Sequence, residues 1–295
     1  MKGDEAPKLL LDANVFRDLA EGSLRQFEER LLRVAECRAP PLLWTCPIVS
    51  DEVLCHVRVE EADRFDHFRE ALRWMDRLCG NLGMAEELLW IRRRPVFVEA
   101  APYENNDLSI ALNQIRRRIL RAETFEELDS DVVESVEERR KQYAAEIAQW
   151  IGRRAVLVVA VQEPPPPGTT KIEGYPMVAN AVFEVSRKHE AKYAPSWGRF
   201  TEPDDQKYAQ REVIAFELAL LLKAQGHADY RIENHPNDYN DGWLCSYPGA
   251  GYTLVTGDRK LMRALQRGEC KNPRVLEIGA ALDLAEKWLA DRPSV

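Results

Sequence analysis

The sequence is poor in histidine and has no paired cysteine motif. Five histidines and six cysteines are scattered over the 295 residues, without a Cys-x-x-Cys pair and without histidines at zinc-ligand spacing. Zinc sites are built from such clusters, so this pattern argues against a zinc protein. The cysteines are instead typical of small buried residues in a reducing compartment.

Long apolar runs are also missing. The longest, residues 213–222, is interrupted by Glu217 and is far shorter than the roughly 20 residues that a membrane helix needs. The first residues, Met-Lys-Gly-Asp-Glu, include no apolar stretch of signal-peptide length. We therefore expect a cytoplasmic protein without membrane segments.

The chain has no excess of positive charge. Its 41 basic and 49 acidic residues give a net charge of -8, so no overall field attracts nucleic acid. A polyanionic partner would have to be held by local basic patches or by bound cations. Acidic residues flank most of the basic clusters, which we expect to be solvated helix faces rather than RNA contacts. These clusters are residues 92–94, 116–118, 139–141 and 153–154.

What the sequence does contain is an apolar run that ends in polar residues. Leu9, Leu10 and Leu11 precede Asp12-Ala13-Asn14, and three successive leucines are typical of a buried strand in a parallel sheet. Asp12 would then lie at the carboxyl end of the strand, where open α/β sheets bind ligands. The alternative is that Asp12 only caps the helix that follows.

Strand and helix patterns alternate at both ends of the chain. Residues 42–49 predict a second buried strand followed by Ser50-Asp51-Glu52, and residues 252–257 predict a third strand followed by Asp258. Residues 275–278 are typical of an edge strand. This alternation predicts an α/β fold with one parallel sheet built from the two ends of the chain.

The middle of the chain is predicted to be mainly helical. Ser23 with Gln26 forms a capping-box pattern that predicts a helix ending near Arg38. Further helices are expected at residues 60–94, 106–121, 124–161, 203–224, 237–247 and 259–267, with a break at 80–83, a short strand at 95–99 and a stiff proline spacer at 164–167. We therefore predict an α/β domain in two parts, residues 1–59 and 236–295, separated by a helical insertion, residues 60–235.

Four acids occupy comparable places along this pattern. They are Asp12, Glu52, Asp258 and a third acid that is either Asp241 or Asp238. Residues at the carboxyl ends of parallel strands meet in one crevice, so we expect these acids to converge. Clustered carboxylates repel unless a cation neutralises them, and oxygen ligands favour Mg²⁺ or Mn²⁺. Such a site is suited to phosphodiester hydrolysis.

These motifs resemble the PIN-domain ribonucleases. The resemblance rests on Leu-Leu-Leu-Asp12-Ala-Asn14-Val, on Pro47-Ile-Val-Ser-Asp-Glu52-Val-Leu and on Leu-Val-Thr256-Gly-Asp258. It implies an α/β/α sandwich with a central parallel sheet and a magnesium- or manganese-dependent endoribonuclease acting on RNA. It also implies an acid quartet supported by Asn14 and Thr256, with a protein partner or antitoxin-like regulator as a further class of partner. It covers residues 8–57 and 236–278, and the long insertion departs from the compact members of the family.

Three alternatives accompany this interpretation. Asp241 lies 17 positions before Asp258 (258 − 241 = 17), which fits the family spacing, whereas Asp238 fits members with an extra acid one helical turn earlier. The same fold could serve as an inactive PIN-like binding or scaffold protein. A haloacid-dehalogenase type of phosphohydrolase is disfavoured, because Asn14 stands where that family needs a second aspartate.

Overall fold

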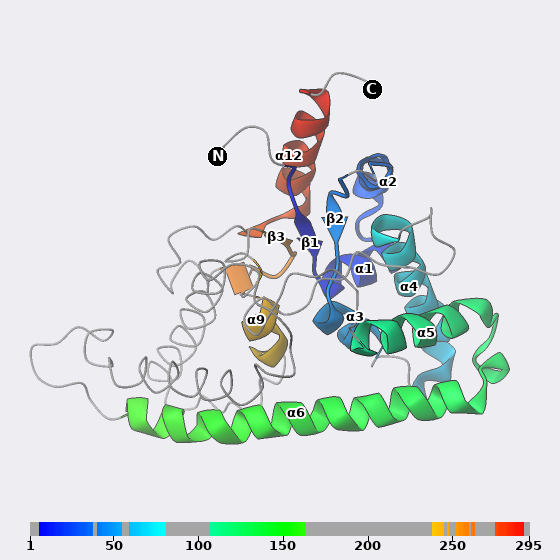
Figure 1. The fold of residues 1–295 in the computed structure, drawn as a ribbon, viewed down its shortest axis with the longest axis vertical. Helices are drawn as coiled ribbons and strands as arrows, with labels where there is room; N and C mark the ends of the chain where they lie inside the picture. Colours follow the sequence, from blue (N-terminus) through cyan, green and yellow to red (C-terminus); the bar gives the residue numbers. More distant parts are fainter. Residues whose placement is uncertain are drawn as a thin grey trace, which may run out of the picture.

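In the computed structural model, the described residues include a parallel β-sheet of four strands (Figure 1). The structure describes residues 6–37, 40–54, 59–80, 107–162, 238–244, 247, 252–259, 261–262 and 275–291. The strands are β1 (Leu9–Leu11), β2 (Leu43–Trp44), β3 (Thr253–Val255) and β4 (Val275–Leu276), arranged β2-β1-β3-β4 with all neighbours parallel. Both ends of the chain therefore contribute to one sheet, which confirms the predicted α/β class.

Strand β1 is an inner strand of the sheet, and its side chains are covered on both faces. Leu9, Leu10 and Leu11 are all fully buried. Leu10 pairs with Trp44 of β2 on one side and with Leu254 of β3 on the other. A strand covered on both faces needs no polar alternation, which explains the run of three leucines.

Helix α1 (Ala13–Ala20) begins directly after β1, with Asp12 as its N-cap. After the C-cap Glu21 the chain turns at Gly22, whose φ is 77°, and Gly22 and Ser23 donate their backbone N–H groups to the carbonyls of Leu19 and Asp18. This is a Schellman ending. Ser23 therefore terminates α1, and the predicted capping box is wrong: a 3-10 turn, η1 (Arg25–Phe27), separates it from α2 (Glu28–Ala35).

The prediction of one strand across residues 42–49 is wrong in its second half. Strand β2 ends at Trp44, and helix α3 (Pro47–Leu54) begins at Pro47. Proline suits the first position of a helix, where its missing N–H would have no helical partner. Asp51 and Glu52 therefore lie inside a helix rather than directly after a strand, where they were predicted.

The described elements from residue 59 to residue 162 are all helical. They are η2 (Val59–Arg64), α4 (Phe65–Cys79), α5 (Asp107–Arg121), η3 (Phe125–Glu127) and the long helix α6 (Ser130–Gln162). Helix α4 packs against α1, α2 and β2, so residues on both sides of the predicted boundary at residue 60 share one core. No helix in the described ranges has both the length and the apolar character needed to cross a membrane.

Two helices accompany the C-terminal strands. Helix α9 (Asp238–Leu244) precedes β3 and confirms the expected short helix. Helix α12 (Ile278–Ala290) follows β4 and packs on β3, β4 and α2, where it buries Ala281, Leu282 and Ala285; no helix was predicted there. The other expected elements lie outside the described residues, namely the strand at 95–99, the spacer at 164–167, the helix at 203–224 and most of the helix at 259–267. The domain division stays a prediction.

Candidate active site

Asp12 lies at the carboxyl end of β1, at the centre of the site. Its side chain is buried, and its Oδ1 accepts a hydrogen bond of 2.7 Å from the backbone N–H of Ala13. Asp12 is thus also the N-cap of α1, as the alternative interpretation expected. Capping occupies Oδ1 and leaves Oδ2 directed to the neighbouring strand.

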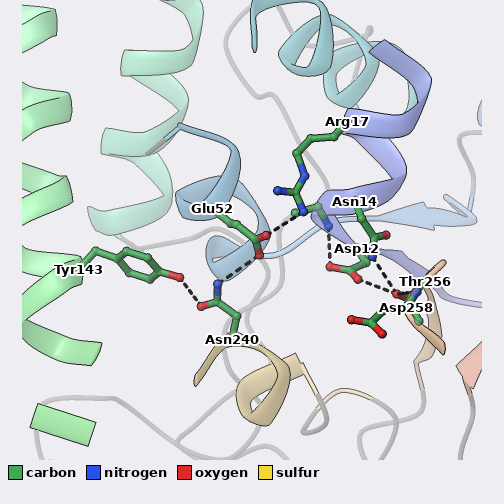
Figure 2. A network of polar contacts seen from close by, with 9 residues as sticks. Asp12, Asn14, Arg17, Glu52, Tyr143, Asn240, Thr256 and Asp258 are labelled. Atoms are coloured by element: carbon green, nitrogen blue, oxygen red, sulfur yellow. Dashed lines mark hydrogen bonds and ion pairs between the residues drawn. The ribbon is translucent and has the colours of Figure 1, made fainter. Parts of the chain in front are cut away.

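Thr256 joins Asp12 to the end of β3. Its hydroxyl donates to Asp12 Oδ2 at 2.7 Å and accepts from the backbone N–H of Asp258 at 3.0 Å and from Asn14 Nδ2 at 3.2 Å (Figure 2). Asp258 Oδ1 in turn accepts from the backbone N–H of Leu261 at 3.1 Å. Asp12, Asn14, Thr256 and Asp258 are therefore brought together by one hydroxyl group, although 242 positions separate Asn14 from Thr256.

Glu52 approaches the site from helix α3 and uses both oxygens of its carboxylate. Arg17 of α1 lies 3.2 Å from Glu52 Oε1 through its Nη2, and Asn240 of α9 donates from Nδ2 to Glu52 Oε2 at 3.2 Å. Asn240 Oδ1 accepts a hydrogen bond from the hydroxyl of Tyr143, on α6 (Figure 2). Helices α1, α9 and α6 thus all contribute to the position of Glu52.

Sequence reasoning missed Arg17, Asn240 and Tyr143. A signal existed for Asn240, which immediately precedes Asp241 in the polar stretch before β3. Arg17 follows Asp12 on the helix that this residue caps, so its proximity to the site could have been inferred. No motif in the sequence around Tyr143 indicated that it belongs to the site, because it reaches the site through a contact between helices that are far apart in the sequence.

The third acid lies on α9. Asp241 is half-buried and directly follows Asn240, the residue that contacts Glu52. Asp238 is the first residue of the same helix, and its side chain lies outside the described part. The choice between Asp241 and Asp238 stays a prediction.

Burial dominates the electrostatics of the site. It raises the pKa of Asp12, and the charge of Asp258 adds to this, while hydrogen bonds from Thr256 and Ala13 and the charge of Arg17 oppose it. Burial also raises the pKa of Glu52 to about 7; the charge of Asp12 adds to the shift, and Arg17 opposes it. Desolvated carboxylates that lie close to further negative charge favour the arrival of a cation.

Asn14 provides a test of whether a hard cation fits. Its Oδ1 is buried and has no hydrogen-bond partner within the described residues, so a neutral oxygen lies ready beside Asp12 and Asp258. Within the same residues, however, no three histidine, cysteine, aspartate or glutamate side chains form a group that could hold a metal ion. The oxygens of Asp12, Asn14 and Asp258 are donors that fit a hard cation. The Glu52 carboxylate, by contrast, binds Arg17 and Asn240.

Several arginines of the basic clusters form ion pairs within the described part of the chain. Arg116 is buried and donates to Asp76 Oδ1 at 2.8 Å, and Arg118 binds two aspartates around the start of α6. Arg139 donates to both carboxylate oxygens of Asp51. The expectation of solvated faces is therefore wrong for Arg116, which is buried, and for Arg139, whose side chain is only 14% exposed, because helix packing places both against acids of other helices. Residues 92–94 and the side chains of 153–154 lie outside the described part.

No protein-family model, curated protein or solved structure shows significant similarity to the chain. Its function therefore has to be inferred from the arrangement of its own residues.

Proposed function

We propose that the protein is a metal-dependent endoribonuclease with a PIN-like α/β/α fold. The observation that carries this proposal is the Thr256 hydroxyl, which binds Asp12 and the backbone of Asp258 where two neighbouring parallel strands end. Open α/β sheets bind their ligands at this edge. Thr256 and Asp258 are also the residues that carry the PIN resemblance at the end of the chain.

The donor set suits Mg²⁺ or Mn²⁺. Asp12 and Asp258 would supply anionic oxygens, and Asn14 Oδ1 a neutral one. Glu52 and one of the acids on α9 would complete the set, which contains only oxygen donors and so suits hard cations. When bound, such a cation activates a water molecule and stabilises the leaving oxygen of a phosphodiester.

The residues of the chain itself hold the carboxylates in place. Thr256 and the Ala13 N–H fix the two oxygens of Asp12, and Asn240, backed by Tyr143, orients Glu52. Ordered carboxylates bind a cation more tightly than mobile ones, because the partners of metal ligands set the ligands' orientation. RNA is the proposed substrate. Its phosphates and the acids of the site are both negatively charged, and the cation would reduce the repulsion between them.

An activity assay tests this proposal. We expect the full chain to cleave single-stranded RNA with Mg²⁺ or Mn²⁺ and to be inactive in excess chelator, and a DNA strand of the same sequence measures the preference for RNA. Asp12→Asn should abolish cleavage, because it removes one anionic ligand. Asp63→Asn, which deletes the same charge at an exposed position, is the matched control and should retain activity. Undiminished cleavage in chelator would refute the metal-dependent mechanism.

The second candidate is a PIN-like binding or scaffold protein without catalysis. It is favoured by the lack of a ready three-acid metal group among the described residues and by the engagement of Glu52 with Arg17. This candidate predicts that the wild-type protein takes up no Mn²⁺ in calorimetry although its acids are intact.

A further inference from the structure

Arg17 is a cation placed among the acids of the candidate site. Its Nη2 lies 3.2 Å from Glu52 Oε1, and its side chain is 33% exposed. Its charge opposes the rise in the pKa of both Asp12 and Glu52. Figure 2 shows the guanidinium between α1 and the Glu52 carboxylate, on the side of the site where Asp12 lies. Arg17 therefore acts on the same carboxylates that the proposed cation would need.

A guanidinium and a divalent cation compete for one carboxylate. Glu52 already uses Oε2 for Asn240, so its Oε1 is the oxygen that Arg17 and a metal ion would both engage. Two positive charges in one desolvated site also repel each other. Binding of the cation should therefore weaken the contact between Arg17 and Glu52.

An arginine released at this place would face the substrate. The planar guanidinium binds phosphate through two parallel hydrogen bonds, and it is partly open to solvent here. The protein as a whole carries a net charge of -8, so a polyanion gains most from a positive charge close to the site. Arg139 of α6 is by contrast bound to Asp51 and Glu146.

We propose that Arg17 exchanges partners during function: it binds Glu52 before the divalent cation arrives and a phosphate of the RNA strand afterwards. The proposal rests on the proposed metal-dependent function and adds a substrate-binding residue to it. It gives Arg17 two opposite effects. Arg17 weakens the affinity for the cation and strengthens the affinity for the RNA.

Calorimetry with Mn²⁺ alone measures the first effect on the full chain. Arg17→Gln should bind Mn²⁺ more tightly than wild type, on the order of threefold to tenfold, because a competing charge is gone. Arg17→Lys keeps the charge and should stay close to wild type. Arg33→Gln removes an equal charge from an exposed position on α2, where Arg33 pairs with Glu286, and should change nothing.

Fluorescence anisotropy with a labelled single-stranded RNA measures the second effect. The titration is done in chelator and in Ca²⁺, a cation that also takes oxygen ligands. In Ca²⁺, wild type should bind the RNA more tightly than in chelator, while Arg17→Gln should lose most of this gain. Arg17→Lys should recover part of it, since an ammonium contacts phosphate as a point charge without the paired geometry.

The outcomes separate the two levels of inference. Tighter Mn²⁺ binding together with weaker RNA binding in Arg17→Gln supports the exchange of partners. If wild type binds Mn²⁺ but Arg17→Gln binds it equally or more weakly, Arg17 is a structural anchor and the exchange is refuted. Unchanged RNA binding in Arg17→Gln refutes the phosphate contact. A wild type that binds no Mn²⁺ overturns the proposed function and this inference with it.

Discussion

The hydroxyl of Thr256 lies 2.7 Å from Asp12 Oδ2 and ties the ends of two neighbouring strands together. Thr256→Val keeps the shape of the side chain but removes its hydrogen bonds to Asp12, Asn14 and the Asp258 backbone. Leaving such buried groups without a partner costs about 1–3 kcal/mol of unfolding free energy. Thr256→Ser retains the hydroxyl and should lose less. Urea unfolding in chelator compares the two variants, and equal losses would show that packing rather than the hydroxyl matters.

Asp258→Asn should stabilise the metal-free protein and weaken its response to metal. The charge of Asp258 raises the pKa of Asp12, which reports repulsion between the two carboxylates, and asparagine deletes that charge. Asparagine can still accept the hydrogen bond from the Leu261 N–H, because it also caps helices well. With a divalent cation the sign reverses, since an anionic ligand is lost.

Thermal melts of wild type and Asp258→Asn measure both effects. In chelator the variant should have a higher melting temperature than wild type. Millimolar Mn²⁺ should raise the melting temperature of the variant less than that of wild type. Equal Mn²⁺ shifts in the two proteins would remove Asp258 from the proposed metal site.

Glu52 should make the metal-free protein less stable as the pH rises. Its folded pKa is raised to about 7 from 4.5, because the carboxylate is buried and near Asp12. Between these values the folded state keeps a proton that the unfolded state has released. The unfolding free energy therefore falls as the pH rises from 4.5 to about 7, by on the order of 3 kcal/mol for the full shift. Above this range Glu52 causes no further fall.

Glu52→Gln tests this dependence, because glutamine cannot titrate. In chelator, between about pH 5 and pH 8, the variant should lose less unfolding free energy than wild type and should be the more stable protein at the upper end. Glu134→Gln, at an exposed position of α6, should follow the wild-type curve. Parallel curves for Glu52→Gln and wild type would contradict the raised pKa.

Local sequence signals predicted the sheet better than they predicted the site. The run Leu9–Leu11 predicts β1, because a strand that is buried on both faces has a continuous apolar sequence. The apolar run at residues 42–49 led to a wrong prediction, because such a run does not distinguish a short strand from a buried helix. Pro47 was the overlooked signal for the start of α3.

The polar contacts of Glu52 could not be paired from the sequence, even where a signal marked one of the residues, for a different reason. They join residues on separate helices: Asn240 is 188 positions from Glu52, and Tyr143 is 97 positions from Asn240. No helical or strand period relates such pairs. The pairing of Arg139 could not be predicted either, because its partner Asp51 lies 88 positions away.

The ion pair between Arg139 and Asp51 should be a main attachment of α6 to α3. Asp51 is buried, and its two oxygens accept from Arg139 Nε at 2.9 Å and from Nη2 at 2.5 Å. Arg139→Met removes this bidentate partner from a buried carboxylate, which costs about 3–5 kcal/mol of unfolding free energy. Arg118→Met removes an arginine from exposed aspartates and should cost much less, because solvent screens such pairs.

The double variant Asp51→Leu with Arg139→Met tests whether the loss of unfolding free energy in Arg139→Met comes from the unpaired, buried charge of Asp51. Replacing both members of a buried pair with apolar residues is often neutral or stabilising, so the double variant should recover most of the unfolding free energy that Arg139→Met loses. Urea unfolding of the single and double variants measures this. A double variant as unstable as Arg139→Met, or equal losses for Arg139→Met and Arg118→Met, would show that the pair is not the attachment of α6 that its geometry indicates.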